Sequence, residues 1–315
     1  MTSDAPRIEP ARQERGNILV IRGGAIGDFI LTLPVFAALR KQFPDARLEV
    51  LSYPHIAQIA LAGGLADEVR SIEARALAGF FARDGRLDEN LARYFAGFAL
   101  ILSYLYDPDD IFQSNVTSCS KAQFITGPHR PDEKLELHAT ESFLKPLEKL
   151  AIYDADPVPR LPLNPQPSTL NPIALHPGSG SERKNWPEEN WMRLIQDLQT
   201  ATKFNFLLVG GEAEVERLHR LSAVFRPDRL ELAQCLPLVD LARRLRSCVG
   251  FIGHDSGISH LAAAVGLPVL VLWGDTNERV WHPRGERVTV IRSPDGIQAL
   301  PVERVLDQLR RFLPE

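Results

Sequence analysis

The chain contains two successive segments that each open with an apolar strand, a glycine-containing loop and a helix. The first begins at residues 17–22 (NILVIR) and the second at residues 173–176. Between them, six prolines fall from Pro157 to Pro172, too many for a helix or a central strand, so this stretch is expected to be an extended linker. Alternating strands and helices predict an α/β fold with parallel sheets, here two Rossmann-like domains facing a central cleft.

A chain of 315 residues is long enough for two domains with separate cores. The ranges predicted are a flexible tail at 1–16, an N-terminal domain at 17–155, the linker at 156–172 and a C-terminal domain at 173–315. The last helix is a candidate to pack back on the N-terminal domain.

Individual elements follow from apolar spacing and helix stop signals. One helix is expected from 29 to 42, with Pro34 tolerated in its first turns. No assignment is made for most of residues 107–134. The remaining expected strands are 47–51, 98–104, 205–209, 249–253, 269–273 and 288–291, and the remaining expected helices include 187–201, 213–225, 238–246 and 302–312.

Composition narrows the possible partners and compartment. The net charge of -4 gives no broad positive field, so nucleic acid is not expected as a partner. Cys119, Cys235 and Cys248 form no CxxC pair, which favours a reducing compartment, small buried thiols and no metal site. The polar N-terminus is not a secretory signal, and no apolar run approaches the ~18 residues of a membrane span. A cytoplasmic protein is predicted.

The stretch from 251 to 273 combines two buried strands with a short helix between them. The first strand runs into His254, Asp255, Ser256 and Gly257. A helix N-terminus beside a hydroxyl attracts phosphate, because its backbone N–H groups are unpaired and carry partial positive charge. The alternative is that Asp255 and Ser256 only cap the helix.

A second loop, residues 176–184 (HPGSGSERK), is rich in small residues that allow a ligand close to the backbone. It lacks the spacing of a P-loop. Lys184 precedes Trp186 and Pro187 and could neutralise a departing diphosphate, or it could be a solvated surface charge. Two phosphate-friendly loops in one half predict a nucleotide diphosphate between them. Glu214 could then bind ribose, although an acidic first turn stabilises a helix anyway.

The first glycine loop carries a carboxylate, Asp28, at the start of a helix. Its glycines at 23, 24 and 27 do not fit the dinucleotide fingerprint. Asp28 could cap the helix, or it could act as the general base for a sugar hydroxyl.

Three stretches resemble glycosyltransferase family 9, the bacterial lipopolysaccharide heptosyltransferases. They are VIRGGAIGDFILTLPVFAALRKQFPDARLEVL, HPGSGSERKNWPEENW and FIGHDSGISHLAAAVGLPVLVLWG. The resemblance implies a GT-B fold with an acceptor-binding N-terminal domain and a nucleotide-sugar-binding C-terminal domain. It also implies inverting transfer of heptose from ADP-heptose to a lipopolysaccharide-core or lipid-linked glycan acceptor, with no cofactor or metal required.

The resemblance assigns roles to individual residues. Asp28 matches the catalytic base and Lys184 the lysine that contacts the donor. Glu214 matches the ribose-binding glutamate and Leu236 an adenine contact. The phosphate and sugar positions are Ser179, Gly180 and Ser181 in the first loop, Asp255 near the heptose, and Ser256, Gly257 and His260 around the diphosphate.

Two differences from the family pattern leave the identity of the acceptor undecided, and with it the identity of the transferred sugar. The N-terminal half lacks a rich basic cluster for a phosphorylated acceptor, and residues 102–107 read LSYLYD where the family often has an Asp-Leu-Gln-Gly-like stretch. The alternatives are another nucleotide sugar or acceptor, an epimerase or hydrolase, or a binding protein without activity. The apolar segment 94–106 is expected to be a buried strand, with a membrane-facing surface as its alternative; peripheral contact with the inner membrane is a further expectation.

Overall fold

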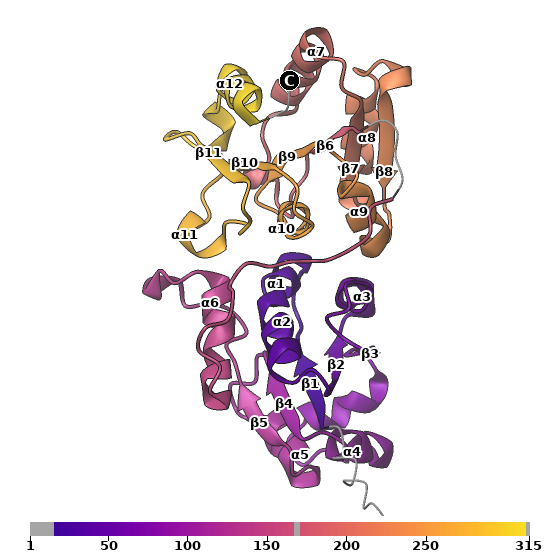
Figure 1. Ribbon diagram of the computed structural model, residues 1–315, viewed down its shortest axis with the longest axis vertical. Helices are drawn as coiled ribbons and strands as arrows, with labels where there is room; N and C mark the ends of the chain where they lie inside the picture. Colours follow the sequence, from indigo (N-terminus) through magenta and orange to yellow (C-terminus); the bar gives the residue numbers. More distant parts are fainter. Residues whose placement is uncertain (1–15, 167–170, 313–315) are drawn as a thin grey trace, which may run out of the picture.

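The protein consists of two α/β domains, each built on a parallel sheet (Figure 1). The computed structural model describes residues 16–166 and 171–312. Nearly all of the predicted flexible tail, and residues 167–170 of the predicted linker, lie outside the described residues. The described part of the linker crosses from one domain to the other without regular secondary structure, as its prolines predict.

The N-terminal sheet has the strand order β3-β2-β1-β4-β5. Its strands pair in parallel, with Val20 opposite both Val50 and Leu102. Parallel strands covered on both faces are apolar along their length, which explains the buried NILVI run of β1. The strand bounds are β1 Asn17–Ile21, β2 Arg47–Ser52, β3 Glu68–Ser71, β4 Leu100–Ser103 and β5 Gln123–Thr126.

The helices of this domain are mostly short. They are α1 Ile26–Ile30, α2 Leu33–Gln42, α3 Pro54–Ala62, η1 Arg75–Phe81, α4 Glu89–Ala96, α5 Ile111–Cys119, η2 Glu133–Leu135, α6 Ala139–Leu144 and η3 Lys145–Leu150. The unassigned region 107–134 therefore contains α5, β5 and the start of η2.

The single helix predicted from 29 to 42 is wrong. The first helix begins at Ile26 and stops at Ile30, and a second one begins at Leu33. Pro34 has no N–H to donate to the carbonyl of Ile30, and its ring would clash with that carbonyl. The chain therefore restarts at Thr32, which leaves α1 as a separate short helix at the end of β1.

The buried strand predicted within the apolar segment 94–106 is confirmed only for its middle. The segment begins with the end of α4, and the strand β4 occupies Leu100–Ser103. Every residue of β4 is buried, and so are Phe95 and Phe98, whereas Tyr106 is 69% exposed. Within the described ranges, no helix is long and apolar enough to cross a membrane.

The C-terminal sheet has the order β11-β10-β9-β6-β7-β8. Its strands are β6 Ile173–His176, β7 Phe206–Gly210, β8 Leu230–Gln234, β9 Gly250–His254, β10 Val269–Trp273 and β11 Val288–Arg292. Its helices are η4 Glu182–Lys184, α7 Glu188–Ala201, η5 Glu212–Glu214, α8 Val215–Ser222, η6 Pro227–Arg229, α9 Leu238–Leu245, α10 Gly257–Ala264, α11 Glu278–Trp281, η7 Ile297–Ala299 and α12 Val302–Phe312. The edge strand β8 was not predicted, because half-exposed residues interrupt its apolar pattern.

The last helix does not pack against the N-terminal domain, contrary to the expectation. Figure 1 shows α12 beside α7, at the far end of the C-terminal domain. Val302, Val305 and Leu309 form one apolar stripe and are buried in the core of that domain. Trp186 anchors the preceding turn by donating its Nε1–H to the Leu300 carbonyl at 2.8 Å.

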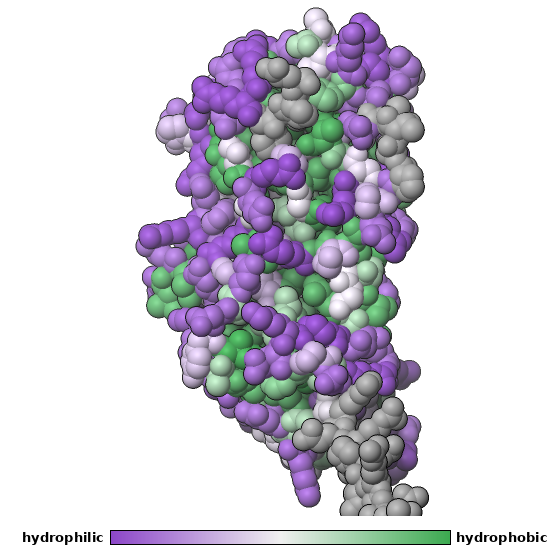
Figure 2. Space-filling view, viewed as in Figure 1, coloured by the Kyte–Doolittle hydropathy of each residue, from purple (hydrophilic) through white to green (hydrophobic). Residues whose placement is uncertain are grey.

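The three cysteines are free thiols, but they are not all buried. Cys119 and Cys248 are half-buried, and Cys235 is exposed. Cys235 follows the edge strand β8 in a turn with a positive φ of 52°, so no neighbouring strand covers it. Hydrophilic residues predominate on the face shown in Figure 2, with apolar areas between them.

The two domains touch closely where α1 packs against α10. A Cβ atom on Gly257 would lie 2.8 Å from the Cβ of Ile26 and 2.9 Å from the backbone nitrogen of Gly27. One cluster of buried apolar side chains extends across this contact and includes Leu161 and Leu163 from the linker. The carboxyl ends of the two sheets are therefore held opposite each other.

A Gly257→Ala substitution tests this contact. The new methyl group would press on backbone and on the half-buried side chain of Ile26, and such overpacking typically costs about 1–3 kcal/mol. We expect the domains to separate, with a larger radius of gyration by small-angle scattering. Gly16→Ala is the matched control, because its nearest atom would lie 3.6 Å away. Identical scattering for the two variants would contradict the tight contact.

Candidate active site

Three adjoining cavities form one groove between the carboxyl ends of the two sheets. An apolar cavity of about 320 Å³ shares Ile26, Gly211 and Ile258 with a central cavity of about 530 Å³. The central cavity shares Gly27 and Gly257 with a third of about 380 Å³. The third contains Asp28 and Lys184 and is called here the catalytic cavity. A larger cavity, of about 920 Å³, lies elsewhere and contains none of the predicted residues.

Asp28 faces the catalytic cavity and also holds its own loop. Its Oδ2 accepts a hydrogen bond from the backbone N–H of Ala25 at 3.0 Å, because it is the third residue of α1. Its Oδ1 lies 3.5 Å from the guanidinium of Arg22. Asp28 can therefore act both as a helix cap and as a general base. Its carboxylate caps α1, and it also lines the cavity in which a base is required.

Arg22 was not predicted from the sequence as a site residue. It is buried beneath the loop, donates to the His129 carbonyl at 2.8 Å and lies with its guanidinium carbon 4.5 Å from the Phe143 ring centroid. Burial lowers its pKa, while the carboxylate of Asp28 acts in the opposite direction. One feature of the sequence could have indicated Arg22: it ends the apolar run NILVIR, and a charged side chain next to a buried strand needs a partner.

Lys184 and Asp255 form an ion pair on the opposite wall, with Nζ 2.6 Å from Oδ2. The side chain of Asp255 is 8% exposed and that of Lys184 is 36% exposed. The helix cap is Ser256, whose hydroxyl accepts a weak hydrogen bond from the Ser259 N–H at 3.4 Å. The capping alternative thus holds for Ser256, whereas Asp255 is committed to the lysine.

The loop before Lys184 is held internally by Ser179. The Ser179 hydroxyl lies 2.8 Å from both the Asn185 Oδ1 and the Ser181 carbonyl. Gly180 lines both the central and the catalytic cavity, with open space around its Cα. Ser181 belongs to the same loop but does not line any of the three cavities. Gly180 is therefore the loop residue that a ligand could approach most closely.

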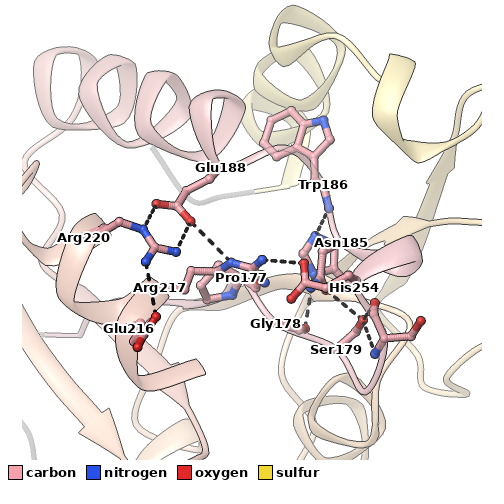
Figure 3. A network of polar contacts seen from close by, with 12 residues as sticks. Pro177, Gly178, Ser179, Asn185, Trp186, Glu188, Glu216, Arg217, Arg220 and His254 are labelled. Atoms are coloured by element: carbon pink, nitrogen blue, oxygen red, sulfur yellow. Dashed lines mark hydrogen bonds and ion pairs between the residues drawn. The ribbon is translucent and has the colours of Figure 1, made fainter. Parts of the chain in front are cut away.

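His254 fixes this loop from beneath, at both of its ends (Figure 3). Its Nε2 accepts the Trp186 N–H at 2.9 Å, so its Nδ1 carries the proton and donates to the Gly178 carbonyl at 3.2 Å. Burial lowers its pKa to about 3, and the ring is neutral at pH 7. The sequence alone gives His254 no role, because neither loop contact is local in sequence.

An arginine pair braces the outer side of the same loop (Figure 3). Arg217 donates to the Pro177 carbonyl at 3.2 Å and to Glu182 at 2.7 Å. Arg220 holds Glu188 with two hydrogen bonds of 2.7 and 2.9 Å. The hydrogen bond from Arg220 lowers the pKa of Glu188, which therefore stays ionised at neutral pH.

Replacing His254 with phenylalanine should release the loop. Two buried backbone groups would lose their partners, at a cost of about 1–3 kcal/mol each. We expect ADP to bind at least tenfold more weakly by calorimetry, with circular dichroism showing a folded protein. His219→Phe, an exposed histidine in the same domain, is the control. His254→Gln can still accept the Trp186 N–H and should fall between the two; equal ADP affinity in all of them would refute this role.

The remaining predicted residues lie along the groove. Glu214 lines the central cavity, accepts the Gly211 N–H at 2.9 Å and packs against Gly178, where a Cβ would lie 2.3 Å from its Cγ. Leu236 is 40% exposed and lines the apolar cavity. The groove thus begins at the apolar cavity, passes Glu214 and the N-terminus of α10, and ends at the Lys184–Asp255 ion pair.

His260 lines the catalytic cavity beside these charges. Burial lowers its pKa to about 4, although Asp255 acts in the opposite direction, so the ring is neutral at pH 7. Among the residues that the structure describes, its Nδ1 has no hydrogen-bond partner. All the predicted residues except Ser181 therefore line one continuous groove.

Two parallel α/β domains with such a groove at the carboxyl ends of both sheets define the GT-B class of fold. Residues 148–308, just over half of the chain, match the model of glycosyltransferase family 9 (heptosyltransferase). The chain belongs to glycosyltransferase family 9.

Its relatives include two kinds of Escherichia coli heptosyltransferase. Lipopolysaccharide heptosyltransferase 1 of strain K12 is 32% identical over 138 residues, which cover 44% of this chain and 42% of that protein. The match therefore spans less than half the length of that relative. Lipopolysaccharide heptosyltransferase 3 is 22% identical over 300 residues, covering 82% of this chain and 83% of that protein.

Solved structures share the fold over almost the whole chain. A family 9 glycosyltransferase from Veillonella parvula has a TM-score of 0.78 at 18% identity and covers 95% of this chain and 98% of its own. The E. coli heptosyltransferase WaaC with ADP has a TM-score of 0.75 at 19% identity, covering 94% and 99%. The predicted GT-B fold and family are confirmed.

Proposed function

We propose that the protein transfers a heptose, with inversion, from ADP-heptose to a hydroxyl of a lipopolysaccharide-core or related glycan. The observation that carries the proposal is that Asp28 and the Lys184–Asp255 pair line the same cavity. A base and a cationic group on opposite walls suit attack by a hydroxyl on a carbon whose leaving group is a diphosphate. The names of the relatives support heptose as the sugar.

The groove suggests where each part of the donor binds. Adenine would lie in the apolar cavity against Leu236, and the ribose hydroxyls would bond to Glu214. The diphosphate would lie between Gly180 and the N-terminus of α10, at Ser256 and Gly257. His260 would lie beside the diphosphate, and Lys184 and Asp255 would lie at the sugar. The ADP in the WaaC structure supports an adenine nucleotide.

In the reaction, the Asp28 carboxylate takes the proton of the acceptor hydroxyl. The acceptor oxygen attacks the anomeric carbon, the bond from that carbon to the diphosphate oxygen breaks, and ADP leaves. Lys184 turns from Asp255 toward the diphosphate as its charge develops, together with the positive end of α10. These groups supply the positive charge that the departing diphosphate needs, so the scheme requires neither a metal ion nor a cofactor.

In this scheme, each domain binds one of the two substrates. Residues 17–155 would hold the acceptor and residues 173–315 the donor. Because the free thiols suit a reducing compartment, we place the protein in the cytoplasm, in peripheral contact with the inner membrane. The net charge of -4 offers nothing to attract nucleic acid.

Calorimetry and product analysis test the proposal. ADP and ADP-heptose should bind and raise the melting temperature, whereas UDP-glucose should do neither. Incubation with ADP-heptose alone should leave the donor almost unchanged. Rapid product formation without acceptor would instead indicate a hydrolase or epimerase, and a protein that binds no adenine nucleotide would be an inactive scaffold.

A further inference from the structure

The catalytic cavity has a second end that the donor does not explain. Its first end opens into the central cavity past Gly27, Gly180 and Gly257. The second end is lined by Leu31, Arg130, Glu133, Thr276 and Trp281. The proposed donor site gives no role to any of these five residues.

Trp281 is fixed in one orientation at this end. It is the last residue of α11, and its indole Nε1–H donates to Glu133 Oε1 at 2.9 Å. The guanidinium carbon of Arg130 lies 5.8 Å from the ring centroid. Because the N–H is already used, the ring offers mainly carbon surface to the cavity.

The domains themselves bring Trp281 and Glu133 together. His138 accepts the Thr140 N–H at Nδ1, so its Nε2–H donates to the His282 carbonyl at 2.9 Å. Burial lowers the pKa of His138 to about 3, which keeps it neutral. Arg284 and Glu141 form a further ion pair at 2.6 Å. Both contacts join segment 133–141 of one domain to segment 279–284 of the other, so the tryptophan wall exists only when the domains meet.

The chemistry of this end suits an uncharged sugar ring. A flat aromatic surface packs against the C–H face of a pyranose, and the adjacent carboxylate and guanidinium can bond to its hydroxyls. The cavity is lined by two cations, Arg130 and Lys184, and by three carboxylates, Asp28, Glu133 and Asp255. A phosphorylated or carboxylated ring would thus meet more negative than positive charge along these walls.

We propose that Trp281, held by Glu133, forms the acceptor subsite and selects a neutral sugar ring. Asp28 lines the same cavity as Trp281, so a ring against the indole would occupy the cavity that also contains the proposed base. This inference rests on the proposed function in requiring sugar transfer. It adds that the reacting acceptor residue carries neither a phosphate nor a carboxylate.

The indole N–H signal of Trp281 provides a direct test by two-dimensional NMR, with Trp281→Phe identifying the signal. The ADP-saturated protein is titrated with a neutral methyl heptoside, with the same heptoside carrying a phosphate, and with a methyl glycoside of the carboxylated sugar Kdo. We expect the neutral heptoside to shift the signal at the lowest concentration. Tighter binding of either anionic glycoside would overturn the inference.

Kinetics with the neutral acceptor provide the second test. Trp281→Ala should raise the acceptor KM about tenfold, while the Kd for ADP stays within about twofold because the indole is not among the groups proposed to bind the adenine, ribose or diphosphate. Glu133→Gln retains an oxygen for the indole N–H, so it should raise the acceptor KM less than Trp281→Ala does. An unchanged acceptor KM in Trp281→Ala, or an equally large rise of KM in Glu133→Gln, would show that the indole does not bind the acceptor.

The two tests separate the subsite from the reaction. If ADP-heptose binds but is not transferred, the proposed function fails, but the NMR titration of the ADP-saturated protein with glycosides still reports on Trp281. If transfer occurs and the signal does not respond to the neutral heptoside, only the subsite fails.

Discussion

An Asp28→Asn variant is expected to lose about 10³-fold in kcat, since general base catalysis typically contributes 10²–10⁴-fold. The asparagine oxygen can still accept the Ala25 N–H, which lies 3.0 Å from Oδ2 of the carboxylate, so the loop should keep its shape. What disappears is the group that takes the proton of the acceptor. The affinity for ADP should be unchanged, because the adenine, ribose and diphosphate positions lie in the other domain.

The control for this experiment is Glu73→Gln. Glu73 lines the central cavity from the same domain but is absent from the lining of the catalytic cavity. Transfer by Asp28→Asn within about tenfold of the Glu73→Gln rate would exclude Asp28 as the base, because a single base normally contributes far more.

The second large effect is expected at the Lys184–Asp255 pair. Lys184→Met should lower kcat by about 10²–10³-fold, the usual loss when one group that stabilises a developing negative charge is removed. It also leaves the buried carboxylate of Asp255 without its cation, at a cost of roughly 1–3 kcal/mol in stability. Both ADP affinity and the melting temperature should fall.

Asp255→Asn should have the opposite effect on ADP binding. Lys184 is partly exposed, so it can be solvated without its partner, and it no longer has to leave a carboxylate to meet the diphosphate. We expect ADP to bind at least as tightly as in the wild type, although transfer should still fall, because Asp255 lies at the sugar position. The two losses should be non-additive in the double variant, since the residues form one unit. Additive losses, or weaker ADP binding in Asp255→Asn, would contradict direct competition for Lys184.

Local signals in the sequence were sufficient for the fold class and most of the site. The strand VLVLW is apolar throughout, and so is β1 after its first residue, Asn17, because parallel strands are covered on both faces. The loops after such strands must lie at the carboxyl edge of a sheet, which is why the sequence alone indicates Asp28, Lys184 and Asp255 as site residues. The predicted helix bounds were wrong where two local rules competed. Apolar spacing indicated one helix from 29 to 42, but Pro34 interrupts it.

The sequence by itself therefore determined two parallel α/β domains, the family, and the loops that carry the candidate base and lysine, because periodicity and capping act over a few neighbouring residues. Only the tertiary structure decided which distant groups meet. Arg22 lies beneath Asp28, both ring nitrogens of His254 bind a loop about 70 residues away, and Trp281 reaches Glu133 across the cleft. These partners are set by the packing of the two sheets and domains, and no local pattern records them.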